Sequence, residues 1–316
     1  MNETKFSLRF KCLIYFAVAF VASLVGIVLR TVNLFFFFDS KPGYYVSGAV
    51  LPILEWVCYG VFALLLLSGA MLWFRKQPIG YEQKTPLLAR IGAIAGVFGF
   101  GILLYADAVL FAYGTTQNVS GLVSLLLSAA SVAYFLLTAL NAKHEALRLL
   151  TGFCVILRLI TALSNSYFNF FVPMNAPDKL MFQLGVLGAM LFLINELRAI
   201  VASPRSATYM FFAGIATLLL GASSLPSLLA LREGILSHTG LTPATVALLG
   251  MYLAVALRFL SLCLSPTPKQ EEIMDAAEAP AEEAIATDTV VGDSADGNAD
   301  AADVENDKEN QEETEQ

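Results

Sequence analysis

Residues 49–74 read AVLPILEWVCYGVFALLLLSGAMLWF, a run in which Glu55 is the only charged residue. An α-helix rises about 1.5 Å per residue, so about 20 apolar residues cross the hydrocarbon core of a bilayer, which is about 30 Å thick. Inside hydrocarbon, backbone donors and acceptors need internal partners, and a helix supplies them. The stretch therefore predicts a transmembrane helix.

Seven further runs of this kind follow one another along the chain. They cover residues 11–30, 89–113, 121–142, 149–170, 180–200, 207–231 and 243–264. The chain is 57% hydrophobic and 14% charged, whereas about a quarter of the residues in a soluble domain are charged. We therefore predict an all-α integral membrane protein with eight transmembrane helices, which form one domain of residues 1–265.

The composition changes abruptly after residue 265. Residues 266–316 hold 17 acidic residues, two basic ones and no aromatic residue, so this segment has a formal charge of −15 while the whole chain has −7. Such a segment cannot bury enough apolar surface to offset the entropy lost on ordering. We expect residues 266–316 to form an acidic, disordered cytoplasmic tail beside a basic transmembrane body.

Basic residues beside short loops indicate the orientation, because they gather on the cytoplasmic side. One side of the predicted bundle has four of them, namely Arg30, Lys41, Lys179 and Arg232. The other side has twelve, namely Lys5, Arg9, Lys11, Arg75, Lys76, Lys84, Arg90, Lys143, Arg148, Arg198, Arg205 and Lys269. This bias predicts that both termini are cytoplasmic. We expect the protein in the plasma membrane.

Short sequence matches link predicted helices that are four apart in the order. They pair IVLR at 27–30 with VILR at 155–158, AGV at 95–97 with AGI at 213–215, and GLV at 121–123 with GLT at 240–242. The pairs favour a weak internal repeat of two four-helix halves in parallel orientation, as some transporters have. Matches this short also arise by chance in apolar sequence, so the alternative of no repeat stays open.

Polar side chains recur at steps of three and four in the predicted fifth helix, which places them on one face. They are Arg158, Thr161, Asn165 and Asn169. Arg158 lies near the middle of the bilayer, keeps its proton there and needs an acceptor. Glu55 and Asp107, in the second and third helices, are the two candidate carboxylates at a suitable depth.

Two interpretations of this pattern stay open. An ion pair of Arg158 with a carboxylate can simply lock the bundle, or it can line a polar cavity between the second, third and fifth helices. Asn165 and Asn169 favour the cavity, because a lock needs fewer hydrogen-bonding groups. A small polar solute or ion would then bind to Arg158, Asn165, Asn169, Glu55 and Asp107.

A second charged cluster is predicted near the cytoplasmic face. Glu196 lies in the last turns of the sixth helix, and Arg258 lies at a comparable depth in the eighth. We expect these two to form a buried ion pair. A structural clamp is the favoured interpretation and an inner gate is the alternative, because neighbouring Arg198 can extend to the interface without a partner.

Several kinds of chemistry lack sequence support. The four cysteines lie in four different runs without the spacing of a metal or disulfide motif, and the two histidines, His144 and His238, lie in connections. No phosphate-binding or dinucleotide-binding motif occurs. We therefore predict no catalytic residue, metal, cofactor or nucleic-acid partner. A lipid-modifying or cell-envelope enzyme stays open, because such enzymes can work with scattered carboxylates.

The leading hypothesis is a protein that binds or translocates a small polar solute or ion through a cavity around Arg158. The alternative is a membrane scaffold or sensor that docks a cytoplasmic protein partner through its inner face and acidic tail. The expected partners are thus the lipid bilayer, a solute or ion, and a protein at the tail.

Overall fold

The computed structural model describes most of the chain before the tail. The described residues are 2–39, 43–75, 79–80, 86–113, 119–142, 144–170, 172–173, 175–201, 206–236, 242–264 and 267–268. They belong to one compact unit that ends at Lys269. Within this part of the chain, eight helices are long and apolar enough to cross a membrane, which confirms the eight-helix prediction. The expected tail lies outside the described residues, apart from 267–268.

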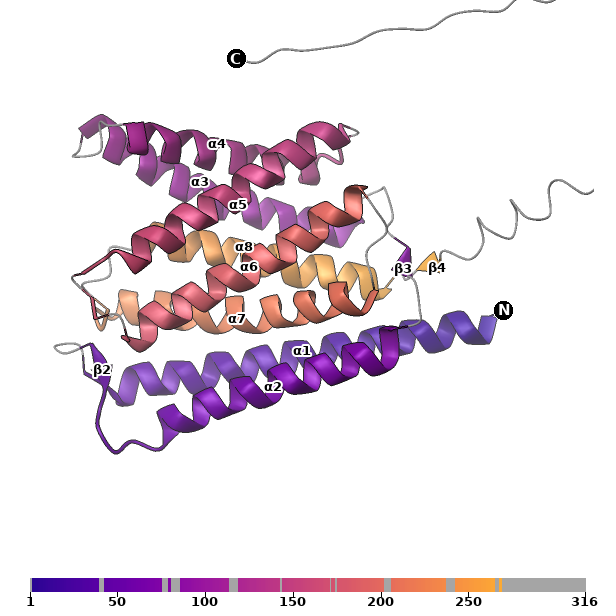
Figure 1. The fold of residues 1–316 in the computed structure, drawn as a ribbon, viewed down its shortest axis with the longest axis horizontal. Coiled ribbons are helices and arrows are strands. Elements are labelled where there is room, and N and C mark those ends of the chain that lie inside the picture. Colours follow the sequence, from indigo (N-terminus) through magenta and orange to yellow (C-terminus); the bar gives the residue numbers. More distant parts are fainter. Residues whose placement is uncertain are drawn as a thin grey trace, which may run out of the picture. The chain divides into compact units, whose positions relative to one another are not determined.

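The eight helices follow one another with short connections (Figure 1). They are α1 (Asn2–Phe36), α2 (Leu51–Phe74), α3 (Leu87–Tyr113), α4 (Val119–Ala139), α5 (Glu145–Tyr167), α6 (Pro177–Val201), α7 (Ser206–Arg232) and α8 (Thr242–Leu264). Two short antiparallel ladders join connecting segments. β1 (Phe38–Asp39) pairs with β2 (Tyr44–Tyr45), and β3 (Ile79–Gly80) pairs with β4 (Thr267–Pro268).

The first helix is longer than the sequence predicts. The run at 11–30 was bounded by Arg30, but α1 continues to Phe36, so Phe35 and Phe36 belong to the helix and not to the following loop. Arg30 is completely buried inside it. The physical reason is that apolar residues continue on both sides of Arg30, and that the guanidinium finds acidic partners on two other helices.

Helices α7 and α8 form the most buried part of the bundle. α7 packs along α1 and α6, and α8 packs along α3. The α3–α8 contact is close because both helices carry glycine there: a Cβ atom on Gly250 would lie 2.7 Å from the Ala95 carbonyl oxygen and 3.1 Å from the Gly99 Cα. Small residues allow this approach of helix backbones in membranes.

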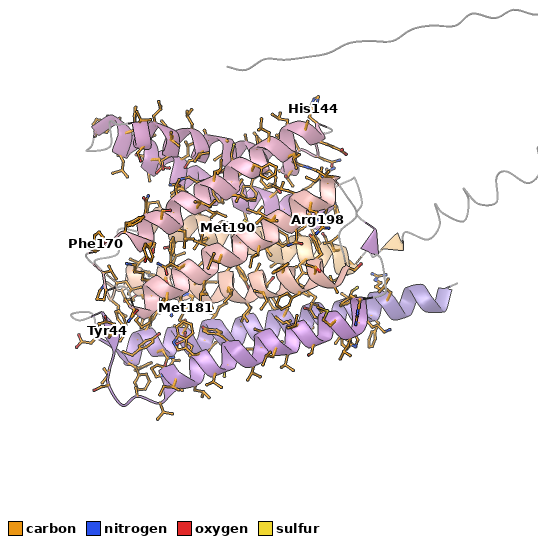
Figure 2. The ribbon with its side chains drawn as sticks, in the orientation of Figure 1. Tyr44, His144, Phe170, Met181, Met190 and Arg198 are labelled. Carbon is orange, nitrogen blue, oxygen red and sulfur yellow. The ribbon has the colours of Figure 1, made fainter. Side chains whose placement is uncertain are left out.

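The bundle has two ends that are useful to name. The hairpin end carries β1 and β2, and Figure 2 shows Tyr44 and Phe170 there. The terminal end carries the start of α1 and the end of α8, and Figure 2 shows His144 and Arg198 there. The start of α1 and β4 thus lie at the same end of this unit (Figure 1).

Candidate functional site

Most of the buried charged side chains among the described residues gather in three clusters at different depths. The hairpin-end centre joins Arg30, Asn33, Tyr45, Glu55, Tyr59, Asp178 and Ser227. The middle cluster joins Asp107, Ser128, Arg158 and Thr161. The terminal-end pair joins Glu196 and Arg258, with Tyr209 bound to the carboxylate.

In the middle cluster, every nitrogen of the Arg158 guanidinium has an acceptor. Nε donates to the Ser128 hydroxyl at 2.7 Å, Nη1 to the Thr161 hydroxyl at 3.1 Å, and Nη2 to both carboxylate oxygens of Asp107 at 2.9 and 3.2 Å. The Ser128 hydroxyl in turn donates to Asp107 at 2.5 Å. The cluster links α3, α4 and α5, and its own side chains supply the acceptors of the guanidinium.

The structure brings only one of the two predicted carboxylates to Arg158. Glu55 lies in the hairpin-end centre, because α2 packs mainly against α1 and α7. Asn165 is exposed, and Asn169 follows the end of α5, where its carbonyl accepts a hydrogen bond from Lys179. Of the five residues expected around one cavity, Arg158 and Asp107 are in contact, whereas Glu55, Asn165 and Asn169 lie elsewhere. The order of helices around the bundle causes this difference.

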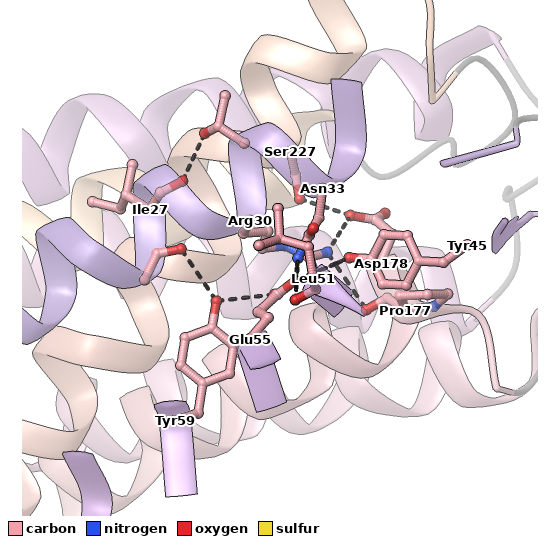
Figure 3. Close-up of polar contacts among 12 residues, drawn as sticks. Ile27, Arg30, Asn33, Tyr45, Leu51, Glu55, Tyr59, Pro177, Asp178 and Ser227 are labelled. Carbon is pink, nitrogen blue, oxygen red and sulfur yellow. Dashed lines mark hydrogen bonds and ion pairs between the residues drawn. The ribbon is translucent and has the colours of Figure 1, made fainter. Parts of the chain in front are cut away.

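Arg30 occupies the hairpin-end centre and faces two carboxylates (Figure 3). Its Nη2 lies 3.1 Å from Asp178 Oδ1 and donates also to the Pro177 carbonyl at 3.4 Å. Its Nη1 lies 3.5 Å from Glu55 Oε1 and 3.5 Å from the Tyr45 hydroxyl. Arg30 and Glu55 are both completely buried, so neither charge is screened by water.

The two carboxylates of this centre have different surroundings. Asp178 lies in the first turn of α6, where the helix dipole favours an anion, and it accepts a 2.7 Å hydrogen bond from Ser227. Glu55 accepts hydrogen bonds from Asn33 Nδ2 at 2.5 Å, from the Tyr59 hydroxyl at 3.0 Å and from the Tyr45 hydroxyl at 3.3 Å. Three neutral donors thus bind Glu55, and the Arg30 guanidinium faces the same carboxylate.

Tyr45 reaches this centre from β2, outside the helices. Burial raises the pKa of its hydroxyl, and nearby Glu55 raises it further while Arg30 lowers it. The net direction is upward, so the hydroxyl keeps its proton at neutral pH and acts as a donor to Glu55.

Lys179, next to Asp178 in sequence, does not join an ion pair among the described residues. Its ammonium is buried and donates to the carbonyls of Tyr167, Asn169 and Val172 at 3.0 to 3.4 Å. These carbonyls follow the end of α5 or close its last turn, where a cation is favourable. The sequence predicts Arg30 and Lys179 beside the loops of one side, whereas both side chains are buried. The apolar residues on both sides of Arg30 were the signal for its burial.

The terminal-end pair lies beside a cavity. Arg258 Nε donates to Glu196 Oε1 at 3.0 Å, and the Tyr209 hydroxyl donates to Glu196 Oε2. All three side chains are buried. The cavity has a volume of about 40 Å³, and both charged groups line it together with mostly apolar side chains of α3, α4, α6 and α8, among them Ala93, Phe135, Phe192 and Met251.

Among the described residues, no group of three or more His, Cys, Asp and Glu side chains is arranged to hold a metal ion. The fold and these clusters define a polytopic α-helical membrane protein with charged groups buried between its helices. No family model, no curated protein and no solved structure matches the chain.

Proposed function

We propose that this membrane protein binds a small polar solute or ion inside its bundle and moves it across the bilayer. The observation that carries the proposal is the cavity at the terminal-end pair, which has both members of a buried ion pair in its wall. Sites for small ligands are concave and mostly apolar, with a few polar groups that fix the ligand. The cavity has this composition.

The charges of the cavity wall determine which ligands it suits. A solute anion can bind to Arg258 and a cation can bind to Glu196, in each case by replacing part of the 3.0 Å contact between them. One water molecule needs about 10–15 Å³ of such cavity space, so a cavity of about 40 Å³ suits an ion or a solute of few atoms. A larger solute requires the pair to separate, which is the gate interpretation of Glu196 and Arg258.

Arg158 has a different role in this proposal from the one expected of it. Its three nitrogens are occupied by Asp107, Ser128 and Thr161, which supports the interpretation of a lock between α3, α4 and α5. We therefore propose the binding site at the terminal end of the bundle, and not in its middle as the sequence suggests.

The orientation of the chain and the kind of membrane are also part of the proposal. We infer that both termini are cytoplasmic, which the excess of basic residues on one side supports, and that the membrane is the plasma membrane. The internal repeat of two four-helix halves stays a prediction. In such a repeat α6 corresponds to α2, and α7 to α3. Helices α6 and α7 pack along each other, whereas α2 and α3 hardly touch, and this difference does not favour the repeat.

The cavity can be tested by filling it. Ala93, in the cavity wall of α3, is buried, so Ala93→Leu places a branched side chain in the space. Purified protein in nanodiscs is heated with a panel of inorganic anions, inorganic cations, small amines and small carboxylic acids. We expect at least one compound to raise the melting temperature of the wild type but not of Ala93→Leu.

The matched control is Ala129→Leu, the same change at an exposed position of α4. It should respond to the compound as the wild type does. A panel without any stabilising compound, or a compound that stabilises Ala93→Leu equally, contradicts the proposed binding place. Uptake of the identified compound into proteoliposomes then separates transport from binding alone.

A docking role for the tail is the second candidate. The pairing of β3 with β4 holds Thr267 and Pro268 beside the connection between α2 and α3. That connection contains Lys76 and Lys84 in its sequence, so a partner at this place would meet charges of both signs. Comparing the proteins bound by the full chain with those bound by a chain truncated after residue 268 tests this role, and identical sets contradict it.

A further inference from the structure

The start of α5 carries a buried arginine that belongs to none of the three clusters. Arg148 is the fourth residue of this helix and is only 5% exposed. Its Nε is buried and has no hydrogen-bond partner among the described residues, and its guanidinium joins none of the ion pairs in that part of the chain. A guanidinium has donors only, so burying its charge without an acceptor is costly. This cost points to a ligand with acceptor atoms.

Neighbouring helices bury Arg148 close to one surface of the bilayer. One turn further along the same side of α5, a Cβ atom on Gly152 would meet Leu197 of α6 and would lie 3.1 Å from Cε2 of Tyr134 on α4. Arg148 precedes Gly152 by four residues, which places it beside the last turns of α4 and α6. At a rise of about 1.5 Å per residue, it lies only about 5 Å from the start of α5. The buried charge is therefore within reach of ligands at the membrane surface.

The first turn of α5 offers further donors beside this guanidinium. The amide of Arg148 donates to the His144 carbonyl, so the amides of residues 145–147 precede the first hydrogen bond of the helix and have no acceptor within it. His144 is the N-cap residue, and its side chain makes no capping hydrogen bond. A long side chain on a helix leans toward the N-terminal end, which brings the guanidinium of Arg148 toward these amides. Free amides, the helix dipole and a guanidinium together attract an anion.

We propose that Arg148 and the first turn of α5 bind a phosphate group at the membrane surface. A guanidinium presents two parallel N–H donors that match phosphate oxygens, and backbone amides at a helix N-terminus bind the same group. Basic pockets between transmembrane helices bind the headgroups of phospholipids, which carry phosphate at this depth. The site does not rest on the solute cavity, because Arg148 is not part of the cavity wall.

A carboxylate of the protein does not take this place in the structure. Glu145 is the acidic residue of the first turn of α5, and it is exposed. It joins none of the ion pairs found in the described ranges of the chain. Its charge opposes a bound phosphate, so removing it should strengthen the binding.

Titration in phosphate-free detergent tests the site. Purified protein in maltoside micelles is titrated with phosphatidylglycerol, with diacylglycerol of the same acyl chains, or with inorganic phosphate, and the melting temperature is followed. We expect a phosphate-containing ligand to raise the melting temperature and diacylglycerol to leave it unchanged. The phosphate that binds at the lower concentration identifies the source, which is either a lipid headgroup or a free ion.

Arg148→Gln separates ligand binding from a structural role. Without phosphate it should melt at or above the temperature of the wild type, because it removes a buried charge that has no partner. It should weaken binding of the phosphate ligand about ten- to hundredfold, as the loss of a hydrogen bond to a charged group does. Glu145→Gln keeps Arg148 and should bind the ligand more tightly than the wild type, which tests the site even where Arg148→Gln does not fold.

Two controls address other sites for the ligand. Arg198→Gln removes an exposed arginine at the same end of the bundle (Figure 2), and Ala93→Leu fills the solute cavity. Both should bind the phosphate ligand as the wild type does. The proposal is overturned by a wild type that neither phosphate ligand stabilises, by an unchanged response of Arg148→Gln, or by an equal loss in Arg198→Gln. A response abolished by Ala93→Leu overturns it too, because the phosphate then binds in the cavity.

Discussion

Asp178 and Glu196 lie on α6 about five turns apart, one near each end of the helix, and therefore on the same face. Each accepts a hydrogen bond from a hydroxyl of α7 and pairs with an arginine of a third helix. The partners are Ser227 and Arg30 for Asp178, and Tyr209 and Arg258 for Glu196. Buried charge thus fastens α6 to α7 at both ends, and links α1 to one end of the pair and α8 to the other.

Removing one member of the terminal-end pair should cost more than removing both. Arg258→Met removes the guanidinium from the buried Glu196 carboxylate, which keeps its hydrogen bond from Tyr209, and breaking a buried pair costs about 3–5 kcal/mol. The double variant Glu196→Leu/Arg258→Met should lose less than Arg258→Met alone, and therefore less than the sum of the two single losses. The measurement is the free energy of unfolding in mixed micelles, arranged as a double-mutant cycle. Additive losses would mean that the two side chains do not interact.

Ser128 should be the hydroxyl whose loss weakens the middle cluster most. It accepts from Arg158 Nε and donates to Asp107, so Ser128→Ala leaves a buried donor and a partly buried acceptor without this partner. We expect a loss of about 1–3 kcal/mol in the free energy of unfolding. The control is Ser68→Ala, because the exposed Ser68 hydroxyl bonds only to a carbonyl of its own helix, Leu65. Equal losses in both variants would contradict the assigned contacts.

The sequence predicts the eight helices because their signal is local. Length and hydropathy identify a span without knowledge of its neighbours, and α2, predicted at 49–74, is Leu51–Phe74 in the structure. The predicted end of α1 is wrong, because the apolar run ends at the charged residue Arg30 but the helix continues to Phe36. The apolar residues on both sides of Arg30 indicate its burial, but its partners Glu55 and Asp178 are distant in sequence, so no local rule reveals them.

A single sequence does not show which of two carboxylates at equal depth an arginine contacts. Glu55 and Asp107 both suited Arg158 by depth, and the packing of α2 on α1 and α7 decides for Asp107. The depths of Glu196 and Arg258 follow from their positions near the ends of α6 and α8, and the structure has them in contact. Depth is therefore readable from sequence, whereas the order of helices around the bundle is not.

The glycine contact between α3 and α8 predicts a sharp difference between two Gly→Ala substitutions. Gly250→Ala places a methyl group 2.7 Å from the Ala95 carbonyl oxygen, a backbone atom that cannot move aside. Overpacking of this kind costs about 1–3 kcal/mol. Gly101→Ala, on α3, has nothing within 4 Å of its new methyl group, so its stability should be unchanged or raised by up to about 1 kcal/mol. Unfolding in mixed micelles measures both, and equal effects would refute the close α3–α8 packing.

The buried thiols of Cys12 and Cys263 should be close enough to be bridged. They come from α1 and α8, which pack against each other, and both are completely buried in the same hydrophobic cluster. Cys58 and Cys154 are partly exposed, so a Cys58→Ala/Cys154→Ala background keeps only the buried pair. In this background, mercury(II) should bind with a stoichiometry of one per chain and protect both thiols from alkylation in detergent.

The control for this bridging is the further substitution Cys12→Ser. It leaves one thiol on α8, so mercury(II) should no longer hold two positions of the same chain, and dimers linked through the metal become the expected product in detergent. Protection that is unchanged by Cys12→Ser, or two alkylatable thiols that persist after mercury treatment of the pair, would show that α1 and α8 do not approach each other at this level. The same result would also contradict the packing of Tyr15 on α1 against Phe259 on α8, whose ring centroids lie 6.1 Å apart.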